Sequence, residues 1–365
     1  MAPPIATRED ILLVAIAWRC LPLLLVVVTA GIGSTACRAQ SSPPPQPSAL
    51  ADAYRGRTVT LIVSSSPGGG YDTLSRMIAK HIGRHIAGTP NVVVQNMAGA
   101  GGIIATNYLY AIAPKDGLTF AGVQNNAPLE PLLGTRSASY DATRFNWLGT
   151  PSVEVGLLAI WHGAQVDTLD QARGHNLKAG APGANSGPSL YARLLTELLG
   201  LKIQVIAGYP GQTQAFLAME RGELDFYGVT FWSALTSTKP DWIAQKKLRI
   251  LLQYGPEKSH ELPDVPFLRD LVTNDDDKAL LVAAEGPLSL GRPYMLPPGV
   301  PADRVAMMRA AFFATLQDPG FVTDARRQQI DISTPRTGEQ LQQELERIHR
   351  TPPHIVERLR RIAQG

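Results

Sequence analysis

The spacing of apolar residues alternates along the chain between that of strands and that of helices. Residues 58–63 have the alternating apolar pattern of a strand, and residues 73–86 carry apolar side chains at helical intervals. Repeated strand, loop and helix units of this kind predict an α/β fold with parallel strands. Further strands are predicted at 92–94, 118–123, 177–179, 203–206, 226–229 and 248–253, and further helices at 103–111, 190–198, 212–221, 302–316, 338–348 and 353–362.

The length of the chain predicts about two domains. At 365 residues it exceeds what one hydrophobic core usually organises. The apolar segment 147–161 is long enough to run from one domain into the next. Residues 262–266 have the composition of a turn, and the acidic stretch 273–278 is predicted to be a solvated loop.

Three glycine-rich loops stand at predicted junctions between a strand and a helix, within 64–72, 98–102 and 180–187. At such a junction several backbone N–H groups point into one concavity at the positive end of a helix, which favours anion binding. Asp72 has the residue type of a helix N-cap, so we expect it to fix where the first helix begins. The amide side chains at 124–126 are expected to line the same crevice.

The composition is that of a globular protein, with 44% hydrophobic and 18% charged residues. The formal net charge is only +3 and the basic residues are spread along the chain, which argues against a nucleic-acid-binding surface. The two cysteines, Cys20 and Cys37, lie near the start of the chain. Neither a disulfide framework nor a cysteine-based metal site is therefore expected in the folded body.

The first 36 residues have the organisation of a secretory signal. Arginines precede the apolar run 20–32, and small residues at 33–36 follow it. The run is short for a membrane-spanning helix. Cleavage before Cys37 would also fit a bacterial lipoprotein, although Ser34 stands where such sites usually carry leucine, so lipidation stays open. Residues 37–53 are predicted to form a tether rich in proline and serine. The chain is thus predicted to be exported to the periplasm.

Catalytic motifs are incomplete. A dinucleotide-type pattern begins at Gly99, but Ile104 stands where close helix packing needs glycine or alanine. Residues 183–187 approach the pattern of a nucleophile elbow, with asparagine in the place of serine. His81 and His85 are four residues apart on the first predicted helix, and without an acidic partner motif we interpret them as a solvated helix face.

Asp225 and a group of aromatic residues leave alternatives open. Asp225 suits a turn or a cap better than a ligand contact. The aromatic residues near predicted strand ends are expected mostly in the core, with one or two of them walling a pocket. They are Tyr209, Phe226, Tyr227, Phe231 and Trp232.

The run P-G-G-G-Y-D-T-L-S-R at 67–76 is followed along the chain by several shorter motifs. This run resembles the P-G-G-G-T-D-x-x-A-R signature of the periplasmic receptors of tripartite tricarboxylate transporters, the Bug family. Each motif is weak alone, but together they follow the family's order over about residues 55–350. The other matching segments are 99–102, 114–119, 209–211, 222–225, 247–249, 262–266 and 296–301.

The resemblance implies a type II periplasmic-binding fold, in which two α/β lobes close on a small organic carboxylate. The first lobe would comprise residues 54–155 and 256–365, and the second residues 156–255. In relatives, backbone groups and bridging waters at the first two glycine loops hold the carboxylate, and loops of the second lobe complete the site. A membrane permease would then receive the solute.

The candidate ligand-binding residues come from the resemblance, from the amides after the third predicted strand and from the loops of the second lobe. Here Ser64–Ser66 replace a family segment with an aromatic residue, and Tyr71 replaces a small hydroxyl residue, which predicts a narrower pocket with one more polar wall. The candidates are Ser65, Ser66, Gly69, Gly70, Tyr71, Asp72, Gly101, Gly102, Asn125, Asn126, Gly183, Asn185, Ser186, Ser189, Tyr209 and Asp225.

We therefore predict an exported, monomeric, non-enzymatic solute receptor for a small organic carboxylate, without a cofactor or metal. One alternative is an exported α/β enzyme that uses Asp72 or Asp225 as an acid or base. Another is a sensory binding protein that signals to a membrane partner. The identity of the ligand does not follow from the sequence.

Overall fold

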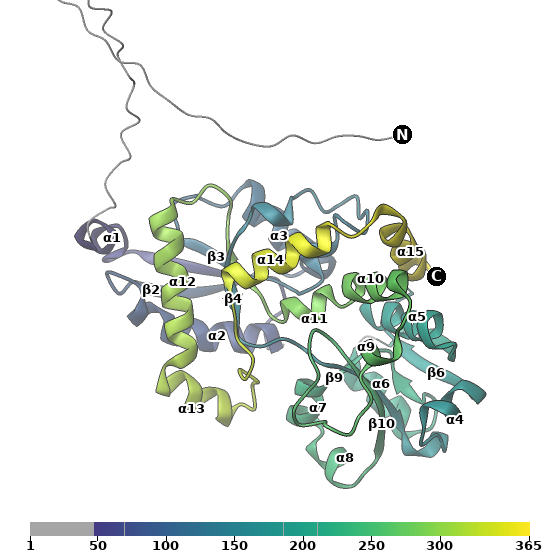
Figure 1. Ribbon diagram of the computed structural model, residues 1–365. Helices are drawn as coiled ribbons and strands as arrows, with labels where there is room; N and C mark the ends of the chain where they lie inside the picture. The colour runs from purple at the N-terminus through teal and green to yellow at the C-terminus, as the bar shows by residue number, and fades with distance from the viewer. Residues whose placement is uncertain (1–46, 69, 185, 210) are drawn as a thin grey trace, which may run out of the picture. The chain divides into compact units, whose positions relative to one another are not determined.

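The computed structural model describes residues 47–68, 70–184, 186–209 and 211–365 (Figure 1). The predicted signal segment and most of the predicted tether lie outside these residues. A six-stranded sheet, here the first sheet, has the order β12-β4-β11-β3-β1-β2. Its strands are β1 (Thr58–Val63), β2 (Asn91–Asn96), β3 (Thr119–Gly122), β4 (Asn146–Thr150), β11 (Tyr294–Leu296) and β12 (Arg336–Thr337).

Helices cover both faces of the first sheet because side chains alternate along its strands. Leu61 and Val63 face one hydrophobic cluster, while Ile62 between them faces another. The first cluster is completed by α2 (Gly70–Ile82), α12 (Ala302–Gln317) and α13 (Pro319–Arg327), and the second by α3 (Ile103–Ala111) and α14 (Gly338–His349).

Two three-stranded sheets follow in the chain. The second sheet has the antiparallel order β10-β5-β9, and the third sheet the parallel order β7-β6-β8. Their strands are β5 (Gly156–Trp161), β6 (Asn176–Ala181), β7 (Lys202–Ala207), β8 (Phe226–Tyr227), β9 (Thr230–Phe231) and β10 (Leu248–Tyr254). The helices of this region are α4 (Leu169–Gly174), α5 (Gly187–Leu199), α6 (Gln212–Glu220), α7 (Trp232–Thr238) and α8 (Pro240–Ala244).

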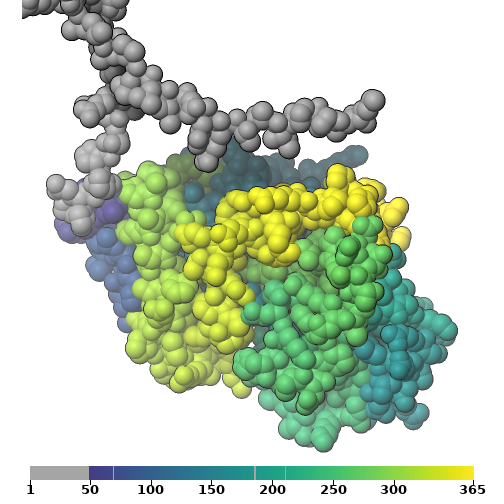
Figure 2. All heavy atoms as spheres, viewed as in Figure 1, coloured from purple at the N-terminus to yellow at the C-terminus, as the bar shows by residue number. Residues whose placement is uncertain are grey.

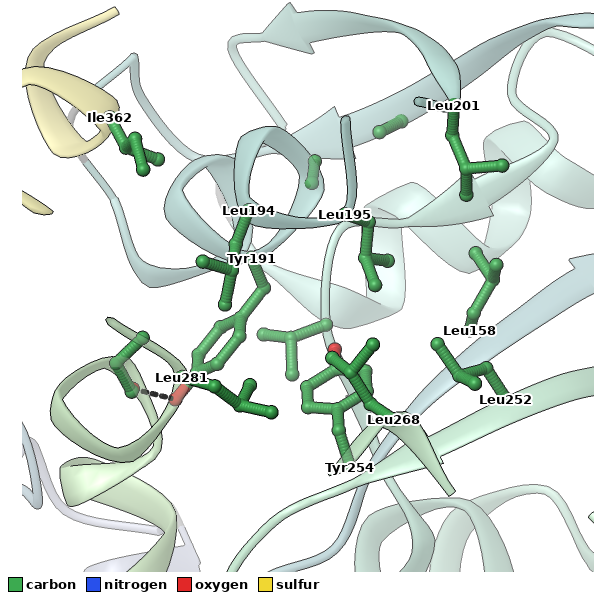
Figure 3. Packing of buried hydrophobic residues seen from close by; sticks show 14 of the residues in the cluster. Leu158, Tyr191, Leu194, Leu195, Leu201, Leu252, Tyr254, Leu268, Leu281 and Ile362 are labelled. Carbon is green, nitrogen blue, oxygen red and sulfur yellow. Dashed lines mark hydrogen bonds between the residues drawn. The ribbon is translucent and has the colours of Figure 1, made fainter. Parts of the chain in front are cut away.

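Several late helices share a hydrophobic cluster with strands and a helix of the region 156–255. Side chains of α9 (Leu268–Leu271), α10 (Asp275–Ala284), α11 (Gly286–Leu290) and α15 (Pro353–Gln364) pack in one cluster with β5, β6 and α5. Figure 3 shows Ile362 of α15 on the side of α5 that carries Leu194. Burial of these apolar side chains thus joins elements that are far apart in the sequence.

Two local predictions were wrong. Residues 47–53, expected in the tether, belong to α1 (Pro47–Tyr54), and the side chain of Tyr54 is buried in the first cluster. The segment 147–161 connects two sheets, because it contains most of β4 in the first sheet, residues 151–155, and β5 in the second sheet. The acidic stretch 273–278 is largely exposed, as predicted, but it is not a loop, since Asn274 caps α10 and accepts hydrogen bonds from the N–H groups of Asp276 and Asp277. Within the described residues no helix is both long and apolar enough to cross a bilayer.

Two stacked tyrosines in the shared cluster allow a matched stability test. The ring centroids of Tyr191 and Tyr254 are 5.3 Å apart, and the Tyr191 hydroxyl donates to the Ala284 carbonyl over 2.9 Å (Figure 3). The Tyr254 hydroxyl is buried and has no hydrogen-bond partner in the described part of the chain.

We expect Tyr191→Phe to lower the free energy of unfolding by about 1 to 3 kcal/mol, because it leaves a buried carbonyl without its donor. Tyr254→Phe should leave stability unchanged or raise it by about 1 kcal/mol, because it removes an unpaired buried hydroxyl. Urea unfolding of both variants measures the difference. Equal losses would mean that the Tyr254 hydroxyl has a partner.

Candidate functional site

The first two predicted glycine loops meet at one edge of the first sheet. Strands β1, β2 and β3 are parallel, with Val63 beside both Asn96 and Gly122, so the residues after each strand lie at the same edge. Strand β11 runs antiparallel to β3, and residues 291–293 before it therefore reach this edge too. The edge brings together the predicted residues Ser65, Ser66, Gly70, Tyr71, Asp72, Gly101, Gly102, Asn125 and Asn126.

Hydrogen bonds join the loops at this edge. The Ser64 hydroxyl accepts from the N–H of Gln124 over 2.8 Å, and the Tyr71 hydroxyl accepts from the N–H of Asn125 over 3.1 Å. Gly102 has φ +95°, and a Cβ atom on it would lie 3.2 Å from the Ser64 hydroxyl. Glycine at this position thus permits both the left-handed backbone and the close approach of two loops.

Asp72 holds the first loop but does not cap α2 as predicted. The helix begins at Gly70, which places Asp72 inside its first turn. The carboxylate accepts from the N–H of Gly68 at 2.8 Å, from Arg76 at 2.9 Å and from the Asn96 amide at 2.8 Å. The hydrogen bond from Arg76 is the main reason that the pKa of Asp72 is lowered to about 2. Asp72 is therefore an ionised anchor between the loop and β2.

The predicted backbone cradle is partly occupied by internal hydrogen bonds. The N–H of Gly68 binds Asp72, and that of Gly102 donates to the Gly99 carbonyl. Gly69 lies outside the described residues. Gly70 occupies the first position of α2, where the helix does not use the N–H group. The Ser65 hydroxyl is buried and has no partner among the described residues, so a donor at this edge remains unused.

Arg292 was not predicted, yet its side chain lies at this edge. Its guanidinium carbon is 5.9 Å from the centre of the Tyr71 ring, and its Nη2 would be 4.0 Å from a Cβ atom on Gly70. Burial raises the pKa of Tyr71 to about 12, so the phenol stays neutral beside this cation. The sequence signal for Arg292 was weak, because only the three-residue strand β11 places it here.

Glu154 links Arg292 to α7. This buried carboxylate lies 3.6 Å from Arg292 and accepts a hydrogen bond from the Ser233 hydroxyl over 2.6 Å. Burial raises the pKa of Glu154, and the neighbouring Arg292 and Ser233 act against that rise. Residues from the first sheet, the segment 151–155 and the second sheet region thus converge on one carboxylate.

The third sheet carries the remaining glycine loop at the carboxyl end of β6. The hydroxyls of Ser186 and Ser189 both donate to the Gly183 carbonyl, over 2.7 and 2.6 Å, and so hold their own loop. Asn185 lies outside the described residues. Tyr209 follows β7 and packs partly buried against the cluster that contains Phe216.

Asp225 is not brought to these loops. It immediately precedes β8, which pairs in parallel with β6, so it lies level with Lys178 inside β6 and before the carboxyl end where the glycine loop begins. Its carboxylate accepts from the N–H of Lys178 over 2.7 Å. Asp72 and Asp225 are both held by backbone groups, and this geometry gives the predicted acid or base role no support.

A cavity of about 450 Å³ lies beside Glu154. It is lined by residues from 153–155, 232–236, 257–261 and 329–334, which include Trp232, one of the aromatic residues considered for a pocket wall, but none of the predicted ligand-binding residues. In Figure 2 the yellow residues after α13 lie beside the green residues that follow β10. The cavity is therefore adjacent to Arg292's partner and separate from the glycine loops.

His81 at the end of α2 and His85 in the 3-10 turn that follows it (Gly83–His85) do not form the predicted solvated helix face. His81 is buried against Phe321 of α13 and contacts the Asp324 carboxylate at 2.8 Å, while His85 contacts Asp318 at 3.0 Å. Sequence reasoning missed α13, which covers this side of α2. Across the described residues, no group of three or more histidine, cysteine or acidic side chains has a geometry suited to a metal ion.

Comparisons with known proteins agree on one family. Residues 74–359 match the family model described as tripartite tricarboxylate transporter family receptor. The fold is similar to a TctC solute-binding protein from Polaromonas, with a TM-score of 0.66 and 20% identity over 84% of this chain and 99% of that one. MatC from Rhodopseudomonas palustris with bound malate has a TM-score of 0.58 and 20% identity, over 85% and 100%. An R. palustris protein with adipate has 0.58 and 22%, over 84% and 97%.

Proposed function

The chain belongs to the tripartite tricarboxylate transporter receptor family, and on this premise we propose that it is an exported receptor for a small organic carboxylate. Family membership supports a receptor without catalytic activity. The similar structures that hold malate and adipate support a dicarboxylate or a related acid as the ligand class. Delivery to a membrane permease and export by the amino-terminal signal are parts of the same proposal.

The amino end of α2 is the observation that carries the proposal. A helix amino terminus attracts an anion through its unpaired N–H groups and its positive dipole end. Here the N–H of Gly70 and the unpartnered Ser65 hydroxyl lie at the edge where three parallel strands end. We propose that the ligand carboxylate binds these donors, and that the lobe built on the second and third sheets closes over it.

A thermal unfolding screen with mono-, di- and tricarboxylates tests the proposed function. An acid present at 100 times its Kd should stabilise the folded protein by about 2.7 kcal/mol through mass action. Small-angle scattering with the best acid should also show a more compact protein, because the lobes close. If no acid in the screen stabilises the protein, the proposed function is wrong.

Gly70→Pro tests whether a backbone N–H binds the ligand. Proline is tolerated at the first position of a helix, and a Cβ atom at Gly70 would meet only the end of the Arg292 side chain. The variant should fold but bind the best acid roughly tenfold or more weakly, since a hydrogen bond to a charged group is worth about 1.5 to 3 kcal/mol. Isothermal titration measures the Kd.

Gly70→Ala is the control, because it adds a similar Cβ atom and keeps the N–H group. Its affinity should stay within about threefold of the original protein. Equal affinity of the alanine and proline variants would assign the ligand to other groups and refute the backbone mechanism.

A further inference from the structure

We infer that the Arg292 guanidinium contacts the ligand, and that the Glu154 carboxylate pairs with this guanidinium only while no ligand is bound. The ligand carboxylate would then replace Glu154 beside Arg292. This inference rests on the proposed function and adds a specificity-determining side chain to a site otherwise built from backbone groups.

The position of Arg292 carries the first step. Its guanidinium lies next to Gly70, the first residue of α2, and beside the ring of Tyr71. A helix amino terminus is itself positive, so a cation there is unfavourable unless an anion lies between them. The two positive groups together form a place for a carboxylate, which can bind a guanidinium and helix N–H groups at the same time.

Glu154 is a poor permanent partner for Arg292. Their closest atoms are 3.6 Å apart, longer than the 2.7 to 2.9 Å that is usual for a charge-assisted hydrogen bond. The other carboxylate oxygen is already held at 2.6 Å by Ser233 of α7. Arg292 keeps about a fifth of its side chain exposed, so it is reachable from solvent. A ligand carboxylate can therefore displace Glu154 without breaking a short hydrogen bond.

The exchange would also connect binding to the second sheet region. Glu154 follows β4, and Ser233 belongs to the helix after β9. When the ligand carboxylate binds Arg292, the contact between Glu154 and Arg292 is lost. The Glu154 carboxylate then keeps its hydrogen bond with Ser233 but is no longer connected to the first sheet. A negatively charged ligand is thus required to separate Glu154 from Arg292, and an uncharged amide or ester of the same acid would not separate them.

The test compares two isosteric variants by titration with the acid that most stabilises the original protein. Arg292→Gln should weaken binding roughly 10- to 100-fold, because it removes a charged donor. Glu154→Gln should tighten binding by about three- to tenfold, because it removes the anion that competes for Arg292 and repels the ligand. The monoamide of the acid should lose most of both effects.

The double variant Arg292→Gln/Glu154→Gln distinguishes a direct contact of Arg292 with the ligand from a role in neutralising Glu154. If Arg292 only neutralises Glu154, the double variant should regain the original affinity. If Arg292 contacts the ligand, the double variant should still bind more weakly than the original protein, because the contact is missing although the repulsion by Glu154 is gone. Unchanged affinity in Arg292→Gln, or weaker binding in Glu154→Gln, would overturn the inference while leaving the proposed function in place. If no acid stabilises the original protein, both are overturned.

Arg269→Gln is the matched control. Arg269 also pairs with a buried carboxylate, Glu285, and its Nε lies 2.7 Å from it. The side-chain hydrogen bonds and ion pairs found for these two residues in the described structure join them to each other and to the N–H of Gly255, and none joins them to α2. This variant should lose stability but change the Kd by less than about twofold. A loss of affinity as large as in Arg292→Gln would show that breaking any buried pair weakens binding, and would contradict a specific role for Arg292.

Discussion

Gly291→Ala is expected to lower the free energy of unfolding by about 3 kcal/mol or more. Gly291 has φ +60° and ψ −116°, a conformation that residues with a Cβ atom rarely adopt. A Cβ atom there would lie 1.8 Å from the Ser152 carbonyl oxygen and 2.9 Å from the Thr150 hydroxyl. Because the first obstacle is backbone, the chain must move and cannot adapt by rotating a side chain.

The same substitution should weaken ligand binding. The Gly291 carbonyl accepts a bond from the Tyr71 hydroxyl at 3.5 Å, and Arg292 follows directly in the chain. Displacement of this segment would move both residues at the amino end of α2. Urea unfolding and titration with the best acid measure the two losses.

Gly200→Ala serves as the control for the backbone conformation alone. Gly200 has φ +69° at the end of α5, and a Cβ atom there would meet no atom within 4 Å. Alanine at this position should cost about 1 kcal/mol, the cost of a left-handed conformation. Equal losses in the two variants would mean that Ser152 moves aside freely, contrary to the expected clash.

Elements with their own local signals were predicted well from the sequence. The strand Thr58–Val63 and the helix Ile103–Ala111 have the predicted bounds, because alternating apolar side chains identify the first and the preceding glycine loop identifies the start of the second. The parallel arrangement of β1, β2 and β3 followed from the repeated strand, loop and helix units.

Features that depend on distant packing were missed. The buried state of His81 depends on α13, which begins more than 200 residues later in the chain and went unpredicted. The three consecutive aspartates of α10 suggested a solvated loop, although acidic residues stabilise the first turn of a helix. Contacts between elements that are far apart in the sequence cannot be read from the local pattern of residues.

The candidate site shows the same division. The glycine patterns in the sequence correctly located the loops at the edge of the first sheet. They did not reveal the role of Asp72, whose hydrogen bonds with Gly68 and Asn96 hold the first loop. Arg292 reaches this edge only through the antiparallel pairing of the short strand β11 with β3. A three-residue strand has too little pattern to be recognised in a sequence.

Arg269→Ala should destabilise the protein by about 3 to 5 kcal/mol at pH 8, because it leaves a fully buried carboxylate unpaired. Glu285 is inaccessible to solvent, and besides Arg269 it accepts a hydrogen bond from the N–H of Gly255 at 2.8 Å. Burial raises the pKa of Glu285 to about 7 in the intact protein, and Arg269 limits that rise. Without Arg269 the pKa should rise further.

The loss in Arg269→Ala should therefore depend on pH. A carboxyl whose pKa is higher in the folded than in the unfolded state binds its proton more tightly when folded, so stability falls as pH rises through the window between the two values. We expect the variant to be markedly more stable at pH 6 than at pH 8, as measured by urea unfolding across that range. Adding Glu285→Gln should abolish most of this slope, and a slope that persists in the double variant would assign it to another group. Arg55→Ala, which breaks the exposed pair with Asp52, is the reference for a surface ion pair and should change stability by less than about 1 kcal/mol at either pH.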